Sequence, residues 1–170
     1  IAVNSHNDVW STYLQNAKTY ISNTHPMAIA KSLMPILDMI EFNEYSDLNI
    51  LCCKELEELL LAYKVPIVKR DKGLQPTLHI WIHCASKEES YEYFLKLEQL
   101  NILTNYRLLP YNLGYGLRIG VSAAVRSGLR PKHLKELATI MATAYTKPID
   151  PNLRKRAYKL IKSIKTTEEL

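Results

Sequence analysis

Cysteine is scarce in this chain, and its placement excludes the roles that clustered cysteines usually have. It occurs only as Cys52, Cys53 and Cys84. Side chains that are neighbours on a helix point about 100° apart, so Cys52 and Cys53 are poor disulfide partners for each other. The spacing matches no zinc motif. So little cysteine fits a reducing compartment, and we expect a cytoplasmic protein without a metal site.

Long apolar runs are also missing. No segment approaches the roughly 20 apolar residues that a membrane-spanning helix needs. Residues 1–18 lack the basic start and the apolar centre of a signal peptide. There is no internal repeat and no low-complexity tract, and we expect no membrane as a partner.

The composition indicates a folded core and a mild excess of positive charge. Hydrophobic residues make up 47% and charged residues 23% of the 170 residues, and the net charge is +5. The excess lies mostly after Arg126, and a basic segment near the C-terminus carries Arg154, Lys155, Arg156, Lys159, Lys162 and Lys165. Tyr158 is the only aromatic residue among these cations, and they occupy more than one helical face. This pattern is typical of a solvated helix, so nucleic acid is not the expected partner.

Periodicity predicts a mixed chain of helices and strands. Helical spacing covers residues 27–40 (kinked at Pro35), 44–63, 86–100, 131–145 and 152–164, and strands are expected at 65–70, 77–84, 101–105 and 116–122. We expect an α+β fold, in which a long helix precedes a small, mostly antiparallel sheet covered by helices. We divide the chain into a connecting segment (1–25), a helical region (26–64) that links to a further domain, and a small α+β domain (65–170).

Arg118 is the most informative single residue, because it lies within an expected strand. The stretch GLRIGVSAAVRSG (116–128) surrounds it with small and apolar residues. A charge in a buried strand is costly unless it has a partner. From the residues alone, that partner is either a core carboxylate or a bound anion. His79 and His83 alternate on one face of another expected strand, but no third metal ligand accompanies them, so we expect packing or surface roles.

Four segments together resemble a known family through their order along the chain. They are LHIWIHC, SKEESYEYFLKLEQLNILTNYRLLPYN, GLRIGVSAAVRSG and LKELATIM. From about Ile21 to Ile164 the chain is similar to the C-terminal part, the small domain, of fold-type I pyridoxal-phosphate enzymes. Within that family it most resembles serine hydroxymethyltransferases, threonine aldolases and transaldolases. The resemblance implies an aminotransferase-like small domain and pyridoxal 5'-phosphate as cofactor.

The resemblance also assigns roles to individual residues. Arg118 matches the arginine that binds the α-carboxylate of the amino-acid substrate, and Arg126 matches a second basic position. Ser122 stands where the family often has threonine, and SAA replaces a proline-containing segment. Four loop residues fall where hydroxymethyltransferases contact the cofactor phosphate of a neighbouring subunit: Ser22, Asn23, Thr24 and His25. From the residues alone, a plain helix cap is the preferred interpretation of this loop.

The catalytic lysine of such enzymes has no match in this sequence. In the family, the lysine that forms the Schiff base lies in a large domain upstream of the matched part. We therefore expect a C-terminal portion or a split subunit, inactive without the chain that carries the large domain and working in a homodimer or heteromer. Two alternatives remain: another fold-type I activity such as aminotransfer, or a non-catalytic interaction module with a basic C-terminal helix.

Overall fold

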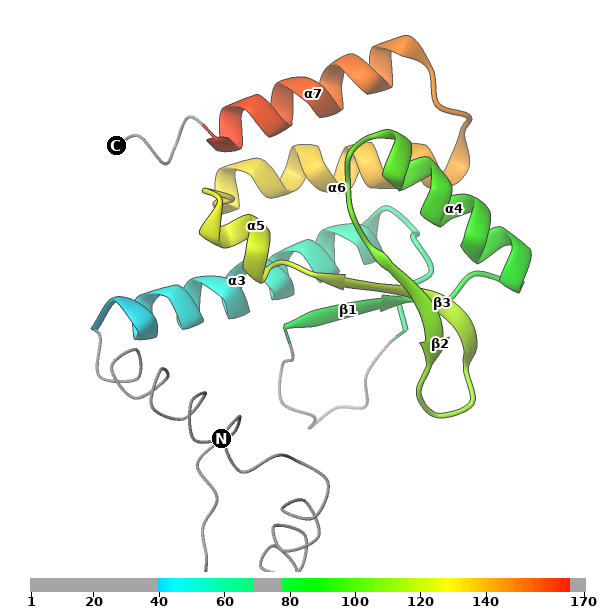
Figure 1. The fold of residues 1–170 in the computed structure, drawn as a ribbon, viewed down its shortest axis with the longest axis horizontal. Coiled ribbons are helices and arrows are strands. Elements are labelled where there is room, and N and C mark those ends of the chain that lie inside the picture. The colour runs from blue at the N-terminus through cyan, green and yellow to red at the C-terminus, as the bar shows by residue number, and fades with distance from the viewer. Residues whose placement is uncertain (1–39, 69–77, 166–170) are drawn as a thin grey trace, which may run out of the picture. The chain divides into compact units, whose positions relative to one another are not determined.

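The computed structural model describes residues 40–68 and 78–165, and Tyr45–Leu170 form one compact unit. The described elements are α3 (Ile40–Ala62), β1 (His79–Ile82), α4 (Lys87–Gln99), β2 (Asn105–Leu109), β3 (Gly114–Gly120), α5 (Ser122–Arg126), α6 (Pro131–Thr146) and α7 (Pro151–Lys165). The expected α+β class, with a long helix before a small antiparallel sheet, is confirmed (Figure 1). The segment 1–25 and the kinked helix over 27–39 lie outside the described residues.

The sheet has three antiparallel strands in the order β1-β3-β2, so β3 lies in the middle. On one face Ile80 and Ile82 of β1 stand opposite Ile119 and Leu117 of β3, and all four are buried. Side chains alternate between the faces of a strand. Arg118 therefore belongs to the opposite face from this apolar set.

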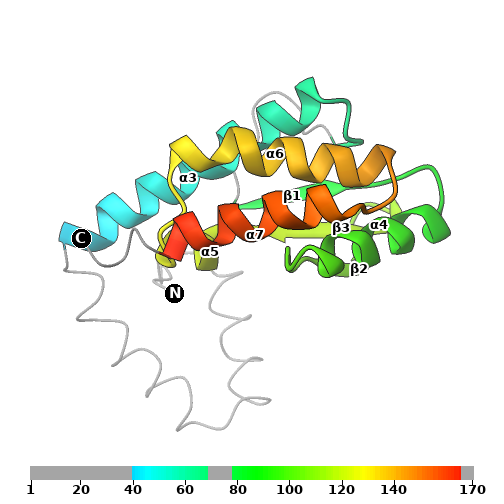
Figure 2. The same cartoon turned by 90° about the horizontal axis from the view of Figure 1, so that it is seen from above.

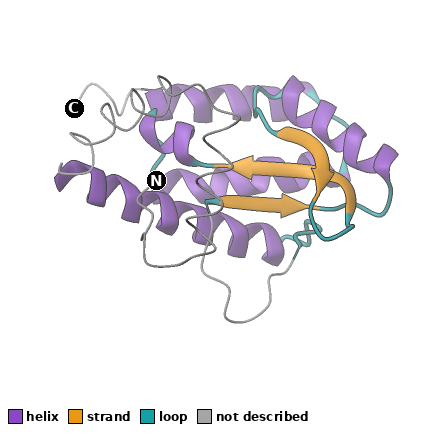
Figure 3. Ribbon diagram, turned by 60° about the horizontal axis from the view of Figure 1, so that its bottom comes forward, coloured by secondary structure: helices purple, strands orange, loops and turns teal. Residues whose placement is uncertain are grey.

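Among the described elements, the helices lie on the apolar face of the sheet. α4 packs against β2 and β3, and α6 packs against both α4 and α7. In Figure 1, α6 lies at a height between α7 and the sheet, and the view from above shows α6 and α7 side by side (Figure 2). Viewed from below, the strands stand in front of the described helices, so none of these helices lies over this face of the sheet (Figure 3). Side chains of α3 complete the core; they are Cys52, Cys53, Leu56 and Leu60.

Two strand predictions need correction. The strand expected at 101–105 is wrong, because residues 101–104 form the turn that ends α4, and β2 begins only at Asn105. The backbone of Asn101 is left-handed (φ 57°), and the Ile102 amide donates to the carbonyl of Leu97. Ile102 thus closes the helix rather than pairing in the sheet, and Leu103 is exposed. At 65–68 the expected edge strand is reduced to one bridge between Ile67 and Ile82.

The start of α4 follows the predicted capping pattern. The Glu89 amide donates to the Ser86 hydroxyl (3.0 Å), and the Glu89 carboxylate accepts from the Ala85 amide (2.9 Å). The other carboxylate oxygen accepts from the hydroxyl of Tyr145 on α6 (3.0 Å). Burial, and then the hydrogen bond to Glu89, raise the pKa of Tyr145 to about 12. A local cap thus also joins α4 to α6.

This network predicts an alkaline loss of stability. Because the folded chain holds the Tyr145 proton more tightly than the unfolded chain does, the stabilisation is complete below pH 10 and is lost as the pH rises through about 12. We expect Tyr145→Phe to remove this dependence, which is worth on the order of 1 kcal/mol. Urea unfolding of both proteins at neutral and alkaline pH measures it. A free-energy difference between them that stays constant across this range would contradict the assignment.

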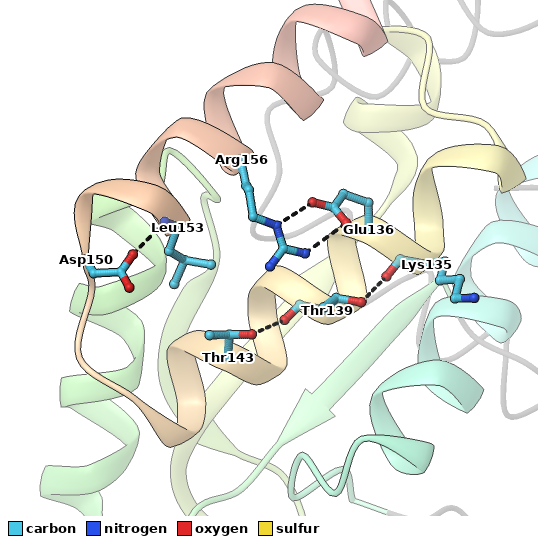
Figure 4. Close-up of polar contacts among 7 residues, drawn as sticks. All are labelled: Lys135, Glu136, Thr139, Thr143, Asp150, Leu153 and Arg156. Carbon is cyan, nitrogen blue, oxygen red and sulfur yellow. Dashed lines mark hydrogen bonds and ion pairs between the residues drawn. The ribbon is translucent and has the colours of Figure 1, made fainter.

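α7 is an amphipathic outer helix held to α6 by packing and one ion pair. Its buried side chains recur at helical spacing and are Leu153, Ala157 and Leu160. The guanidinium of Arg156 donates two 2.9 Å hydrogen bonds to the Glu136 carboxylate, and Asp150 caps the helix by accepting from the Leu153 amide (Figure 4). Arg156 lowers the pKa of Glu136 through these bonds. Arg154 donates to Gln99, so part of the basic segment serves contacts within the domain.

None of the helices among the described residues has the length and apolar character needed to cross a membrane.

Candidate functional site

The face of the sheet that the helices leave uncovered brings β1 and β3 side chains together. In the antiparallel register, Trp81 stands opposite Arg118, and His79 stands opposite Gly120. Residues directly opposite each other share a face and lie within contact distance. Asn105 of β2 stands on the other side of Arg118. The central strand thus presents one cation between an aromatic ring and an amide.

Gly116 lies where the strands pack too closely for a side chain. A Cβ at this position would overlap the carbonyl oxygen of Ile82 and would lie 2.6 Å from Cδ1 of Leu109. Real Cβ atoms do not approach other heavy atoms so closely, so the position requires glycine. The missing side chain lets Leu109 of β2 close over β3. At Gly120, by contrast, a Cβ would make an ordinary 3.6 Å contact with the imidazole of His79.

Arg118 has a buried donor that no described residue pairs with. Its Nε is inaccessible to solvent and makes no hydrogen bond, and the residues that the structure describes place no carboxylate within ion-pair distance of it. The guanidinium lies beside Trp81, whose ring centroid is 6.0 Å from Cζ of Arg118. That distance is the outer limit of a cation–π interaction. Within the described part of the chain, the core carboxylate considered as its partner does not appear.

Trp81 also has a buried donor with no partner among the described residues, and the sequence did not identify Trp81 as a site residue. The indole Nε1 is also buried and has no hydrogen-bond partner. The ring of Tyr111, from the turn between β2 and β3, lies 6.2 Å from the Trp81 ring. The only signal in the sequence was the alternation of Trp81 with His79 and His83 on a strand. The pairing with Arg118 depends on strand register, which that alternation does not reveal.

The other predicted site residues are not brought to Arg118. Ser22, Asn23, Thr24 and His25 lie outside the described residues. Arg126 is exposed in the last turn of α5, and the structure records no contact between it and Arg118. Ser122 begins α5, and its carbonyl accepts a 2.8 Å hydrogen bond from the Tyr45 hydroxyl. The roles of Arg126 and of the 22–25 loop stay predictions.

Comparison with known proteins shows that the chain is similar to part of a longer enzyme. No family model matches it. It is 30% identical over 151 residues to a serine hydroxymethyltransferase of Thermoplasma acidophilum, covering 84% of this chain and 35% of the relative. It is 27% identical over 129 residues to a serine hydroxymethyltransferase of Pyrobaculum islandicum, covering 73% and 30%. The chain thus spans about a third of the length of the curated relatives it matches.

A solved structure supports the same relationship at the level of the fold. The L-threonine transaldolase from Pseudomonas fluorescens, in its internal aldimine state, matches 74% of this chain and 29% of its own with a TM-score of 0.66 and 18% identity. Together these similarities confirm the resemblance drawn from the motif order. The chain is similar in sequence to part of serine hydroxymethyltransferases and in fold to part of a threonine transaldolase, and a C-terminal small domain fits both similarities.

Proposed function

We propose that this chain is the small-domain portion of a pyridoxal-phosphate-dependent enzyme that acts at the α-carbon of an amino acid. In this proposal Arg118 binds the α-carboxylate of the substrate, as in the serine hydroxymethyltransferase and threonine aldolase or transaldolase reactions. The observation that carries the proposal is the buried, unpartnered Nε of Arg118 on the uncovered face of the sheet. Buried donors are almost always hydrogen-bonded, so one without a partner calls for a ligand.

The residues around Arg118 fit a substrate carboxylate. A guanidinium presents a planar fork of donors that matches the two oxygens of a carboxylate, and the Nε edge belongs to that fork. The ring of Trp81 lies beside the guanidinium, and Nε of Arg118 is shielded from solvent. A charge-assisted hydrogen bond is stronger in such surroundings than in open water. The described residues thus fit the substrate end of the site.

The contribution of this chain is binding and orientation. Pyridoxal phosphate, when bound, supplies the electron sink for chemistry at the α-carbon. The resemblance assigns Ser22–His25 to its phosphate, and these residues would hold it together with the large domain. Arg118 would fix the carboxylate on the rigid central strand and so set which bond of the α-carbon faces the cofactor. Holding a reactant in the productive orientation lowers the barrier without forming a bond to it.

The proposed reaction needs a second segment. Because the chain spans about a third of its curated relatives, we assign the cofactor-binding lysine to a large domain, carried upstream or by a separate subunit. An oligomer and a cytoplasmic setting belong to the same proposal. Another fold-type I activity, such as aminotransfer, remains the alternative, since the small domain is shared while other residues set the chemistry.

Covalent labelling tests this division of labour. Borohydride reduction fixes pyridoxal phosphate permanently to the lysine that holds it, and peptide mapping then locates that lysine. We expect the label on a segment that co-purifies with residues 1–170, and none on residues 1–170 when they are purified alone with the cofactor. A stoichiometric label on a lysine within residues 1–170 would overturn the proposal.

A further inference from the structure

We propose that Trp81 is a second substrate-binding residue, whose indole N–H donates to the same carboxylate that Arg118 binds. This inference rests on the proposed function of Arg118 and adds to it a residue from a different strand. The motif containing Arg118 did not include Trp81.

Two orphaned donors on one face of the sheet carry the inference. Nε of Arg118 and Nε1 of Trp81 are both buried without a hydrogen-bond partner, and the two residues stand directly opposite each other on β3 and β1. Indole N–H is a donor only, and so is guanidinium N–H. Neither can satisfy the other. Their common deficit is an acceptor, and the group that supplies acceptors without donors is an oxyanion.

The two side chains lie close enough together to contact one ligand. Cζ of Arg118 lies 6.0 Å from the centroid of the Trp81 ring. A carboxylate whose two oxygens each accept a hydrogen bond of about 2.9 Å bridges donors that lie several ångströms apart. Both oxygens would face the Nε edge of Arg118, and one of them would also accept from Nε1 of Trp81, because each carboxylate oxygen has two lone pairs.

The surroundings of Trp81 favour a fixed ring. Its strand neighbours His79 and His83 stand over positions occupied by glycine on β3, with the His79 ring at Gly120 and the His83 ring at Gly114. The Tyr111 ring lies against the indole at 6.2 Å. A ring held on a strand between such neighbours loses little freedom when it binds a ligand, and preorganisation of this kind favours affinity.

Two donors from different strands predict selectivity for a carboxylate over its amide. A carboxamide replaces one acceptor oxygen with a donor group, which cannot accept from either side chain. The amide would leave at least one buried donor without a partner. We therefore expect a substrate amide such as glycinamide to bind more weakly than glycine, with both residues contributing to the difference.

The test uses the complete enzyme, with the large domain present, and the variants Trp81→Phe, Trp81→Ala and Arg118→Gln. Phenylalanine keeps an aromatic face for Arg118 and removes only the N–H donor. Glycine binding is measured by isothermal titration calorimetry. The indole N–H resonance of Trp81, identified by its loss in Trp81→Phe, is followed in the same titration of the 15N-labelled wild-type enzyme. We expect Trp81→Phe to raise the Kd for glycine about tenfold, and the indole resonance to shift as glycine saturates the site.

The variants separate this inference from the proposed function. If Trp81→Phe binds glycine as tightly as the wild type while Trp81→Ala and Arg118→Gln bind it weakly, Trp81 only supports the guanidinium and the inference is overturned. In that case the role of Arg118 stands. If Arg118→Gln also binds glycine normally, the proposed function of the site itself fails.

Discussion

Replacing Arg118 with glutamine lowers kcat/KM for the amino-acid substrate of the complete enzyme about 100- to 1000-fold. Losing one side of a buried charge-assisted pair costs about 3–4 kcal/mol, and each 1.4 kcal/mol corresponds to a factor of ten. Because Nε of Arg118 has no partner among residues 40–68 and 78–165, its removal breaks no hydrogen bond of the described fold. We therefore expect the free energy of unfolding to change by less than about 1 kcal/mol.

A large loss of kcat/KM with an unchanged free energy of unfolding distinguishes a substrate-binding role of Arg118 from a structural role. A structural arginine would lose stability and activity together, whereas a binding arginine loses activity alone. Steady-state kinetics and urea unfolding of the same preparation measure both. Arg154→Gln is the matched control. Arg154 lies on the outer helix α7, outside the site, and its guanidinium donates hydrogen bonds to Gln99 of α4. Unchanged kinetics in Arg118→Gln would remove the carboxylate assignment.

Replacing Gly116 with alanine destabilises the sheet by about 3 kcal/mol. The added methyl group would overlap the carbonyl oxygen of Ile82 and crowd the side chain of Leu109. Leu109 can move, but the Ile82 carbonyl belongs to the backbone of β1 and can move only by parting the strands. Overpacking a dense interior costs about 1–3 kcal/mol, with higher values when backbone must move. A loss of about 3 kcal/mol lowers Tm by roughly 10 °C in a domain of this size.

Gly120 provides the matched control on the same strand. A methyl group there makes an ordinary 3.6 Å contact with the His79 ring, and the backbone does not need a positive φ. Alanine in a strand is favoured over glycine by roughly 0.5–1 kcal/mol, so Gly120→Ala should unfold at or above the temperature of the wild type. Differential scanning calorimetry compares the two variants. Equal melting temperatures would show that β1 and β3 are not packed as closely at Gly116 as the structure has them.

The sequence predicted those parts of the fold that depend on local patterns. The capping box of Ser86 and Glu89 is a four-residue motif, and it marks the start of α4. The spacing of the apolar residues in α6 and α7 indicates which face of each helix is buried. The strand at 101–105 was wrong for a local reason that alternation cannot reveal. The left-handed Asn101 ends α4 in a turn and moves the pairing to Asn105.

The site was only partly predictable, because it is assembled across strands. The motif around Arg118 identified the cation through its resemblance to a family. Whether the cation pairs with a core carboxylate or stays free for a ligand depends on what surrounds it, and no local pattern contains that. Trp81 becomes a candidate only when the register of β1 against β3 sets it opposite Arg118. The close approach of Leu109 to Gly116 is likewise a tertiary contact.

The most direct test of the central claim is the preference of the site for a carboxylate over a carboxamide. The Kd values of glycine and glycinamide are measured for the complete enzyme and for its Arg118→Gln variant. If Arg118 binds the substrate carboxylate, the wild type prefers glycine by about 100-fold or more, and the variant loses most of that preference because glutamine carries no charge to pair. A variant that keeps the full preference for glycine would contradict the account.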